Sequence, residues 1–174
     1  MKTPSRIIAG LAATAALAAG MALPANAADT NTSAELSAGT LSISAPANFA
    51  LNPIVPGTVT TSVLKGVTVT DNRAGETGWA ATVDVLSLIG HDGRQLSADT
   101  ITYIPETQSQ SGTVGLNSPA SASKFASATY QQTVQSAYYV KGNNKVTWDA
   151  TIEIAAPSDA LADTYFGRIV HSVY

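Results

Sequence analysis

Alternation of apolar and polar side chains is the feature that most constrains the fold of this chain. It is clearest in residues 146–156, where every second residue is apolar and most residues between them are polar. Alternate side chains of an extended strand point to opposite faces, so a period of two is typical of a half-buried sheet. Residues 79–85 and 164–173 repeat the pattern, and outside the N-terminal segment no stretch of ten or more residues carries a helical apolar stripe. The sequence therefore predicts an all-β protein.

Turn-forming residues divide the chain into short strands. Residues 142–144, Gly-Asn-Asn, favour positive φ and predict a hairpin between the strands on either side. About eight short strands separated by turns indicate an antiparallel β-sandwich, immunoglobulin-like in topology. Tyr165, at the start of the last strand, is similar to the tyrosine corner of such sandwiches. The expected strands cover residues 40–45, 58–64, 66–70, 79–85, 101–104, 133–140, 145–156 and 164–173, with an edge strand at 113–116.

The first 27 residues predict a signal peptide. Lys2 and Arg6 form a basic start, residues 7–19 are apolar, and residues 25–27 offer small side chains to a signal peptidase. The apolar run is shorter than the ~20 residues of a membrane span, and no second run of that length follows. We therefore expect cleavage after Ala27 and export of a soluble protein. Residues 28–38 are small and polar and predict a flexible leader, and residues 39–174 predict a single domain.

Charge and cysteine content exclude several classes of function. Removing Lys2 and Arg6 with the signal peptide leaves seven basic and twelve acidic residues, a formal charge of −5, with no block of like charges. Nucleic acid is therefore not an expected partner, because phosphate neutralisation needs clustered Lys and Arg. The same sign argues against holding anionic wall polymers by bulk electrostatics. The sequence contains no cysteine, which excludes disulfides, thiol catalysis and cysteine-ligated metals.

Catalytic and metal-binding patterns are weak. His91 lies in a predicted turn and His171 on the last strand, and no nucleophile elbow is present, so we expect no enzyme. We expect His171 to be a strand-end residue with one satisfied nitrogen. Asp71, Asn72 and Glu76 lie close together and could supply oxygen ligands for calcium, but no EF-hand spacing is present. We therefore predict no metal and no cofactor, with Asp71 and Asn72 capping a turn.

Two tryptophans dominate the candidate binding residues. Trp79 and Trp148 each lie on the apolar face of a predicted strand, which favours core packing over ligand stacking, although an indole can serve either purpose. If the tryptophans pack inside, binding falls to exposed tyrosines and to loops, of which the candidates are residues 71–78, the turn at 90–93 and the tract 109–129. Consecutive tyrosines on a strand point to opposite faces, so one of Tyr138 and Tyr139 should be exposed. The candidate binding residues are Asp71, Asn72, Arg73, Trp79, Tyr139 and Trp148.

Three segments in order resemble a known family. Residues 69–73 with Gly78-Trp79, residues 146–148, and residues 163–173 together look like the actinobacterial branch of the WxL-like domains, over about residues 41–173. The resemblance implies a β-sandwich on the outer surface of a Gram-positive cell, bound non-covalently to the wall, often beside companion surface proteins. The family motif has leucine two residues after tryptophan, whereas this chain has Ala81 and Ala150. This departure bears on wall binding more than on the fold.

The sequence thus favours an exported, non-catalytic cell-envelope protein. We expect it to lie on the cell surface or to be secreted, and to associate with peptidoglycan or with a companion surface protein. The alternative is a structural, pilus-like or adhesive subunit that polymerises by strand exchange, although the leader offers only Leu36 as a bulky apolar residue. A secreted hydrolase ranks last, because no acid, base and nucleophile constellation is recognisable.

Overall fold

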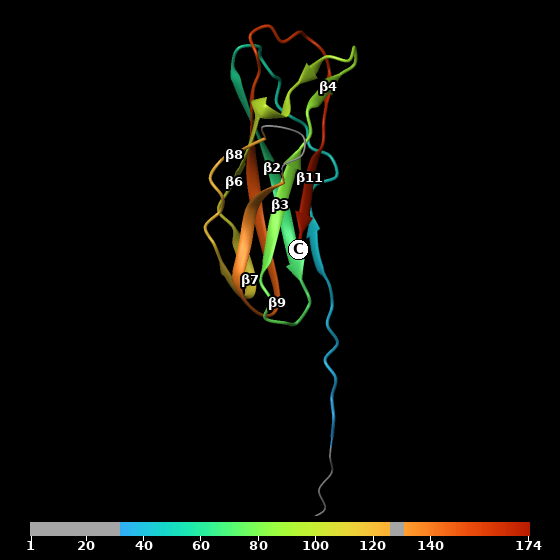
Figure 1. Ribbon diagram of the computed structural model, residues 1–174, viewed down its shortest axis with the longest axis vertical. Coiled ribbons are helices and arrows are strands. Elements are labelled where there is room, and N and C mark those ends of the chain that lie inside the picture. Colours follow the sequence, from blue (N-terminus) through green and yellow to red (C-terminus); the bar gives the residue numbers. More distant parts are fainter. Residues whose placement is uncertain (1–31, 126–130) are drawn as a thin grey trace, which may run out of the picture. The chain divides into compact units, whose positions relative to one another are not determined.

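Antiparallel strands make up almost the whole of the computed structural model, which describes residues 32–125 and 131–174 (Figure 1). Every strand pair in this part of the chain is antiparallel, which confirms the predicted all-β class. The strands are β1 (Leu41–Ser44), β2 (Val59–Asp71), β3 (Trp79–Val85), β4 (Leu88–Gly90), β5 (Gln95–Leu96), β6 (Ile101–Pro105), β7 (Ser109–Leu116), β8 (Ser123–Lys124), β9 (Gln132–Ala155), β10 (Tyr165–Phe166) and β11 (Ile169–Val173). A short 3₁₀-helix, η1 (Ala98–Thr100), precedes β6.

The long strand β9 is the centre of the main sheet. Its first half pairs with β3, and its second half pairs with β2 over residues 144–155. Along its other edge β9 pairs with β7 and then with β6. The path of hydrogen-bonded strands runs β1-β2-β9-β3-β11, and β4, β5 and β10 form a separate small sheet. The strand β9 therefore connects the part of the sheet that contains β3 and β11 with the part that contains β1, β2 and β6.

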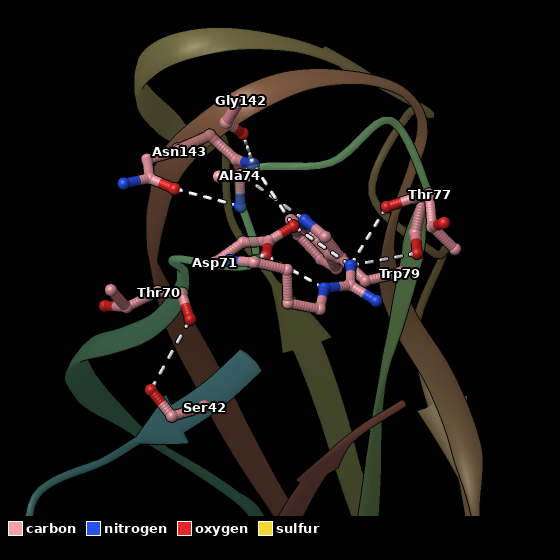
Figure 2. A network of polar contacts seen from close by, with 11 residues as sticks. Ser42, Thr70, Asp71, Ala74, Thr77, Trp79, Gly142 and Asn143 are labelled. Atoms are coloured by element: carbon pink, nitrogen blue, oxygen red, sulfur yellow. Dashed lines mark hydrogen bonds and ion pairs between the residues drawn. The ribbon is translucent and has the colours of Figure 1, made fainter. Parts of the chain in front are cut away.

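The predicted hairpin around residues 142–144 is wrong in its pairing, although the chain bends back at Gly142 and Asn143 (Figure 2). Residues 132–155 are continuous as the single strand β9. Gly142 has the expected positive φ of 72°. However, the two flanking segments do not pair with each other; they pair with β3, β7, β2 and β6. Lys141 pairs with Thr113 and Asn144 with Gly112, so Gly142 and Asn143 bulge out of the ladder. A Gly-Asn-Asn sequence suits a bulge as well as a turn, and the partners that decide between them lie far away in sequence.

The two ends of the strand path meet without pairing. β1 and β11 bring Cα atoms within 8 Å of each other, yet β1 pairs only with β2 and β11 only with β3 within the described residues. The sheet is therefore nearly closed, with a seam between β1 and β11 (Figure 1). Residues from Leu36 to Tyr174 form one compact unit. The predicted signal peptide, residues 1–27, lies outside the described residues, as do residues 28–31 of the predicted leader.

Both tryptophans lie in the core, as strand parity favoured. Trp79 is 3% exposed and Trp148 is 1% exposed. The two alanines that replace the leucines of the resembled motif, Ala81 and Ala150, are fully buried beside them on the same strand faces. The remaining core consists mostly of β-branched and aliphatic side chains on the inner faces of β2, β3, β6 and β9.

Tyr138 and Tyr139 are both exposed, which corrects the expectation that only one of them would be. Val114 pairs with Val140, Gly115 with Tyr139 and Leu116 with Ala137, so β9 carries one extra residue at this point. A bulge of this kind breaks the alternation of faces, because two residues on one strand lie opposite a single residue on the other. The exposed fractions are 69% for Tyr138 and 51% for Tyr139.

The predicted last strand is interrupted at residues 167–168. β10 pairs with β4 in the small sheet, whereas β11 pairs with β3 in the main sheet. Just before the break, the Tyr165 hydroxyl donates to the carbonyl oxygen of Leu161 at 2.8 Å. A hydroxyl that returns to the backbone a few residues upstream is the contact that defines a tyrosine corner. The similarity noted in the sequence therefore extends to the hydrogen bond.

We expect Trp148→Ala to lower the free energy of unfolding by ~3–5 kcal/mol, because it removes a fully buried ring and leaves a cavity. Urea denaturation followed by circular dichroism measures this change. Tyr138→Ala removes an exposed ring and is the matched control, expected to change stability by less than ~0.5 kcal/mol. Equal losses in the two variants would contradict the core role of Trp148.

Candidate functional site

A buried ion pair organises the loop between β2 and β3. Asp71 ends β2 with a side chain only 2% exposed, and its Oδ1 atom lies 2.9 Å from Nε of Arg73. Nη2 of Arg73 donates to Oδ2 of the same carboxylate at 2.9 Å, so the pair is bidentate. The hydrogen bond from Arg73 lowers the pKa of Asp71 below its ordinary value, against the opposing effect of burial. Asp71 is therefore held as a carboxylate.

Arg73 also closes the loop around its own backbone (Figure 2). Its Nη2 atom donates to the carbonyl oxygens of Thr77 at 2.9 Å and Gly78 at 3.2 Å. The backbone N–H of Arg73 donates to Oδ1 of Asp71 at 3.1 Å, which caps the turn as predicted for Asp71. The predicted cap by the Asn72 side chain is not formed within the described residues, where Asn72 bonds through its backbone. Every polar contact that Arg73 makes in the described residues thus returns to the loop that carries it or to the adjoining end of β2.

Asn144 links this loop to the core, and sequence reasoning missed it. Its Nδ2 atom donates to Oδ2 of Asp71 at 3.3 Å, and its Oδ1 atom accepts from Nε1 of Trp79 at 3.4 Å. The bulge beside it holds the loop directly: Gly142 N–H donates to the Gly75 carbonyl at 2.9 Å, and Ala74 N–H donates to Oδ1 of Asn143 at 3.1 Å. The Gly-Asn-Asn segment could be recognised in the sequence, but its hydrogen bonds to the loop between β2 and β3 depend on how those strands pair with β9.

Three of the six predicted binding residues, Asp71, Arg73 and Trp79, therefore meet in one network that connects β2, β3 and β9. Asn72 is exposed and contributes through its backbone, which exchanges hydrogen bonds with Gly39 and Thr40 beside β1. The polar groups of the ion pair and the indole N–H are engaged in internal hydrogen bonds. These residues therefore stabilise this end of the sandwich and are not free to bind a ligand. The two remaining predicted residues, Tyr139 and Trp148, lie elsewhere.

Trp148 begins a second polar chain inside the sandwich. Its indole N–H donates to the Tyr103 hydroxyl at 3.1 Å, and that hydroxyl lies 3.2 Å from Nε2 of His171. An indole nitrogen can only donate, so the hydroxyl proton is free to point toward His171. Burial raises the pKa of Tyr103 to about 12 and lowers that of His171 to about 4. His171 is accordingly a neutral imidazole with one nitrogen satisfied, as expected from the sequence.

A recess of about 1100 Å³ lies beside the small sheet, with Leu88 of β4 and Tyr165 and Phe166 of β10 in its lining. Figure 1 shows β4 at one end of the sandwich. One wall is the proline-containing segment 45–56, and the other is the segment 160–168. The floor consists of core side chains, and His171 lies at the edge of the lining. The bulky apolar residues of the two walls and of β11 that retain exposed surface are Phe49, Leu51, Ile54, Leu161, Tyr165, Phe166 and Ile169.

Hydrogen bonds fix both walls of this recess. Asn52 donates from its side chain to the Thr61 carbonyl at 2.6 Å and from its backbone to Ser62 Oγ at 2.8 Å, which ties segment 45–56 to β2. On the other wall, Oδ2 of Asp163 lies 3.4 Å from Nη1 of Arg94. The Tyr165 hydroxyl bond braces the same segment. The recess is therefore a built feature of the fold, and not a gap between loose loops.

Sequence reasoning did not identify this recess. It named the loop after Asp71, the turn at 90–93 and the tract 109–129 as candidates, of which residues 126–130 lie outside the described residues. The available signal was the proline-containing loop together with the adjacent Tyr165-Phe166 pair. A smaller recess of about 430 Å³ lies elsewhere, beside Val63, Glu106 and Asp149, and its lining is more polar.

The described residues hold no group of three or more His, Asp or Glu side chains that could bind a metal ion. In the same ranges no helix is long and apolar enough to cross a membrane. No protein-family model matches the sequence. No curated protein matches it at a significant level.

One solved structure with some likeness to this chain is a family 123 glycoside hydrolase from Clostridium perfringens, described in connection with glycolipid glycan hydrolysis. The match has 16% sequence identity and a TM-score of 0.40, and it covers 68% of this chain and 19% of the hydrolase. This chain therefore corresponds to less than a fifth of the hydrolase. A likeness of this size carries no argument about fold or activity.

We expect Asp71→Asn to lower the free energy of unfolding at pH 7 by ~1–3 kcal/mol, because it removes the charge that Arg73 faces in a buried site. The pKa of Asp71 is lowered on folding, so the carboxylate stabilises the fold above its unfolded pKa, and that contribution is lost as pH falls through the lowered value. The difference between wild type and variant should therefore shrink below about pH 4. Urea denaturation across pH 3–7 measures it. Asp159→Asn, at an exposed aspartate, is the control, and a pH-independent difference for Asp71→Asn would contradict the assignment.

We expect His171 to make stability fall as pH drops from about 6.5 to about 4. Its folded-state pKa of about 4 lies below the unfolded value, so the unfolded chain binds the proton first. The contribution is complete above about pH 6.5 and is lost below it, and His171→Gln should remove this part of the pH dependence. Proton NMR titration of the ring is the direct measurement. A midpoint near 6.5 for His171 would contradict its burial.

Proposed function

We propose that this chain is an exported, non-catalytic cell-envelope protein that associates non-covalently with a Gram-positive cell wall or with a companion surface protein, and that the recess between segments 45–56 and 160–168 is its recognition site. The observation that carries the proposal is the partly exposed apolar surface gathered on these two braced segments. Phe166 is 66% exposed and Leu161 is 59% exposed, on the same wall. Contiguous apolar surface on loops of a rigid scaffold is typical of an interaction site.

The resemblance to WxL-like domains supports the cell-envelope setting, and the signal peptide expected at residues 1–27 supports export. In this chain the tryptophans and the alanines that follow them are buried, so they are not available to a ligand. Recognition by this protein must therefore use other residues than the name motif of the family. The rim of the recess supplies aromatic and aliphatic side chains that suit this purpose.

A net negative mature domain also favours a contact of this kind. Bulk attraction to anionic wall polymers is opposed by the formal charge of −5 that remains after removal of Lys2 and Arg6. Apolar contact and hydrogen bonding do not suffer from that repulsion and are weakly dependent on salt. Association through the recess should accordingly persist at high ionic strength.

Cosedimentation of the mature protein with purified Gram-positive sacculi, bearing or stripped of their proteins, tests the proposal. We expect binding that persists at high salt and falls at least tenfold in a double variant, Leu161→Ala with Phe166→Ala, because exposed apolar rim residues are removed without touching the core. No soluble sugar fragments should accumulate during the incubation if the protein is not a hydrolase.

The matched control is Tyr138→Ala with Tyr139→Ala, which removes two bulky side chains of similar exposure on β9. If the control loses binding and the rim variant does not, recognition lies on β9 and the recess is not the site. Protein that stays in the supernatant with both kinds of sacculi at every salt concentration overturns the association itself. Circular dichroism confirms that both variants remain folded.

A further inference from the structure

One edge of β11 has unused backbone hydrogen-bonding groups. Tyr174 and Ala80 exchange backbone hydrogen bonds, and Leu86 N–H donates to the Arg168 carbonyl, so even-numbered residues of this segment face β3. In an antiparallel ladder the odd-numbered residues then point their N–H and C=O groups to the opposite edge. These residues are Ile169, His171 and Val173, and no strand in the described residues pairs with that edge.

This free edge runs into the recess. β1 lies near β11 at the seam but ends at Ser44, where the chain leaves the sheet and continues as segment 45–56. Beyond that point Arg168, Ile169 and His171 line the recess. A row of backbone donors and acceptors therefore borders an apolar hollow, which is the arrangement that receives an added strand.

We propose that the recess receives an extended peptide segment of a companion surface protein, which adds to β11 as a strand and places alternate apolar side chains between segments 45–56 and 160–168. This inference rests on the proposed function, since it names the partner of the same site. A recess of about 1100 Å³ lies above the ~300–1000 Å³ usual for small-molecule pockets, which suits an elongated occupant.

The lining favours a peptide over a wall glycan. Sugar recognition needs several convergent polar groups, but the side chains of Asn52 and Asp163 already serve the walls through Thr61 and Arg94. The other polar side chains of the lining, Asn48, Thr164 and Arg168, stand among a larger number of apolar residues. The Nε2 atom of His171 faces Tyr103. The rest of the lining is mostly apolar surface beside an open backbone edge. An added strand would pair with the backbone groups of that edge and place its alternate side chains against the apolar surface.

The lining also favours a companion over a second copy. A donor strand needs alternating apolar residues, whereas in residues 32–40 of this chain Leu36 is the single bulky apolar residue. The C-terminal strand β11 alternates, but it is already paired with β3. A second copy therefore has no free segment of the right pattern among its described residues.

The first experiment uses fluorescence anisotropy of a labelled probe peptide, acetyl-Thr-Val-Thr-Ile-Thr-Val-Thr-amide, with the mature protein. We expect saturable binding that weakens at least tenfold when alternate backbone nitrogens of the peptide are methylated, because methylation removes the ladder donors and keeps the side chains. Equal binding by both peptides, or no binding of either, overturns strand addition. Both measurements use the wild-type protein, so neither depends on a variant that folds.

The second experiment compares Ile169→Pro with Ile169→Val. Proline at the first residue of an edge strand removes an outward N–H without breaking a bond to β3, whereas valine keeps both the N–H and an apolar side chain. Peptide binding should fall at least tenfold in the proline variant and stay within about twofold of wild type in the valine variant. Circular dichroism and the His171 ring signal report whether the fold is kept. Loss of binding in both variants, or in neither, contradicts pairing at this edge.

These outcomes separate the inference from the proposed function. If protein-bearing sacculi retain the domain through the Leu161 and Phe166 rim but the peptide does not bind, the strand-addition inference fails and the proposed function stands. If the peptide binds but neither kind of sacculus does, the cell-envelope association fails. A concentration-dependent dimer that is abolished by Ile169→Pro would overturn the companion in favour of a second copy.

Discussion

Backbone pairing along β9 is the constraint on which the rest of the structure depends. This single strand hydrogen-bonds with β2, β3, β6 and β7, and the other strands of the main sheet attach only through these four. Its bulges near residues 134, 138 and 142 bend the ladder and change which side chains face inward. A shift of one residue in its register would move the buried side chains of β9 to the exposed face and its exposed side chains to the buried face. The apolar alternation in residues 144–155 protects against that shift.

The predictability of this fold follows from how local each feature is. Period-two alternation identified β3, β11 and the second half of β9, and strand parity placed Trp79 and Trp148 inside, because both depend only on near neighbours in sequence. The Tyr165 corner was equally local. The continuity of β9, the exposure of both Tyr138 and Tyr139 and the role of Asn144 depend on partners far along the chain, which period and turn chemistry do not report. The recess was missed for the same reason, since its two walls lie more than 100 residues apart in sequence.

The two ends of the sandwich differ in how many of their polar and apolar groups are already in contact with other parts of the protein. At one end Asp71, Arg73, Asn144 and Trp79 satisfy one another, and the loop that they hold offers few free polar groups to a ligand. At the other end the walls are braced by hydrogen bonds, while apolar side chains and one backbone edge are left uncovered. A closed, self-satisfied end suits support, and an open but rigid end suits recognition, because little ordering entropy is lost when a partner arrives.

The late position of β9 in the chain sets the order in which this protein can assemble. In the ladder between β2 and β9, Val59 pairs with Ala155 and Thr60 with Ile154. Strands β1 to β7 therefore have no central partner strand until most of the polypeptide has been synthesised. Pairings of such long sequence separation fold slowly, because loop-closure entropy is lost before the contacts form. A chain that stays unfolded until its last third appears remains threadable through a membrane pore, which fits the export proposed for it.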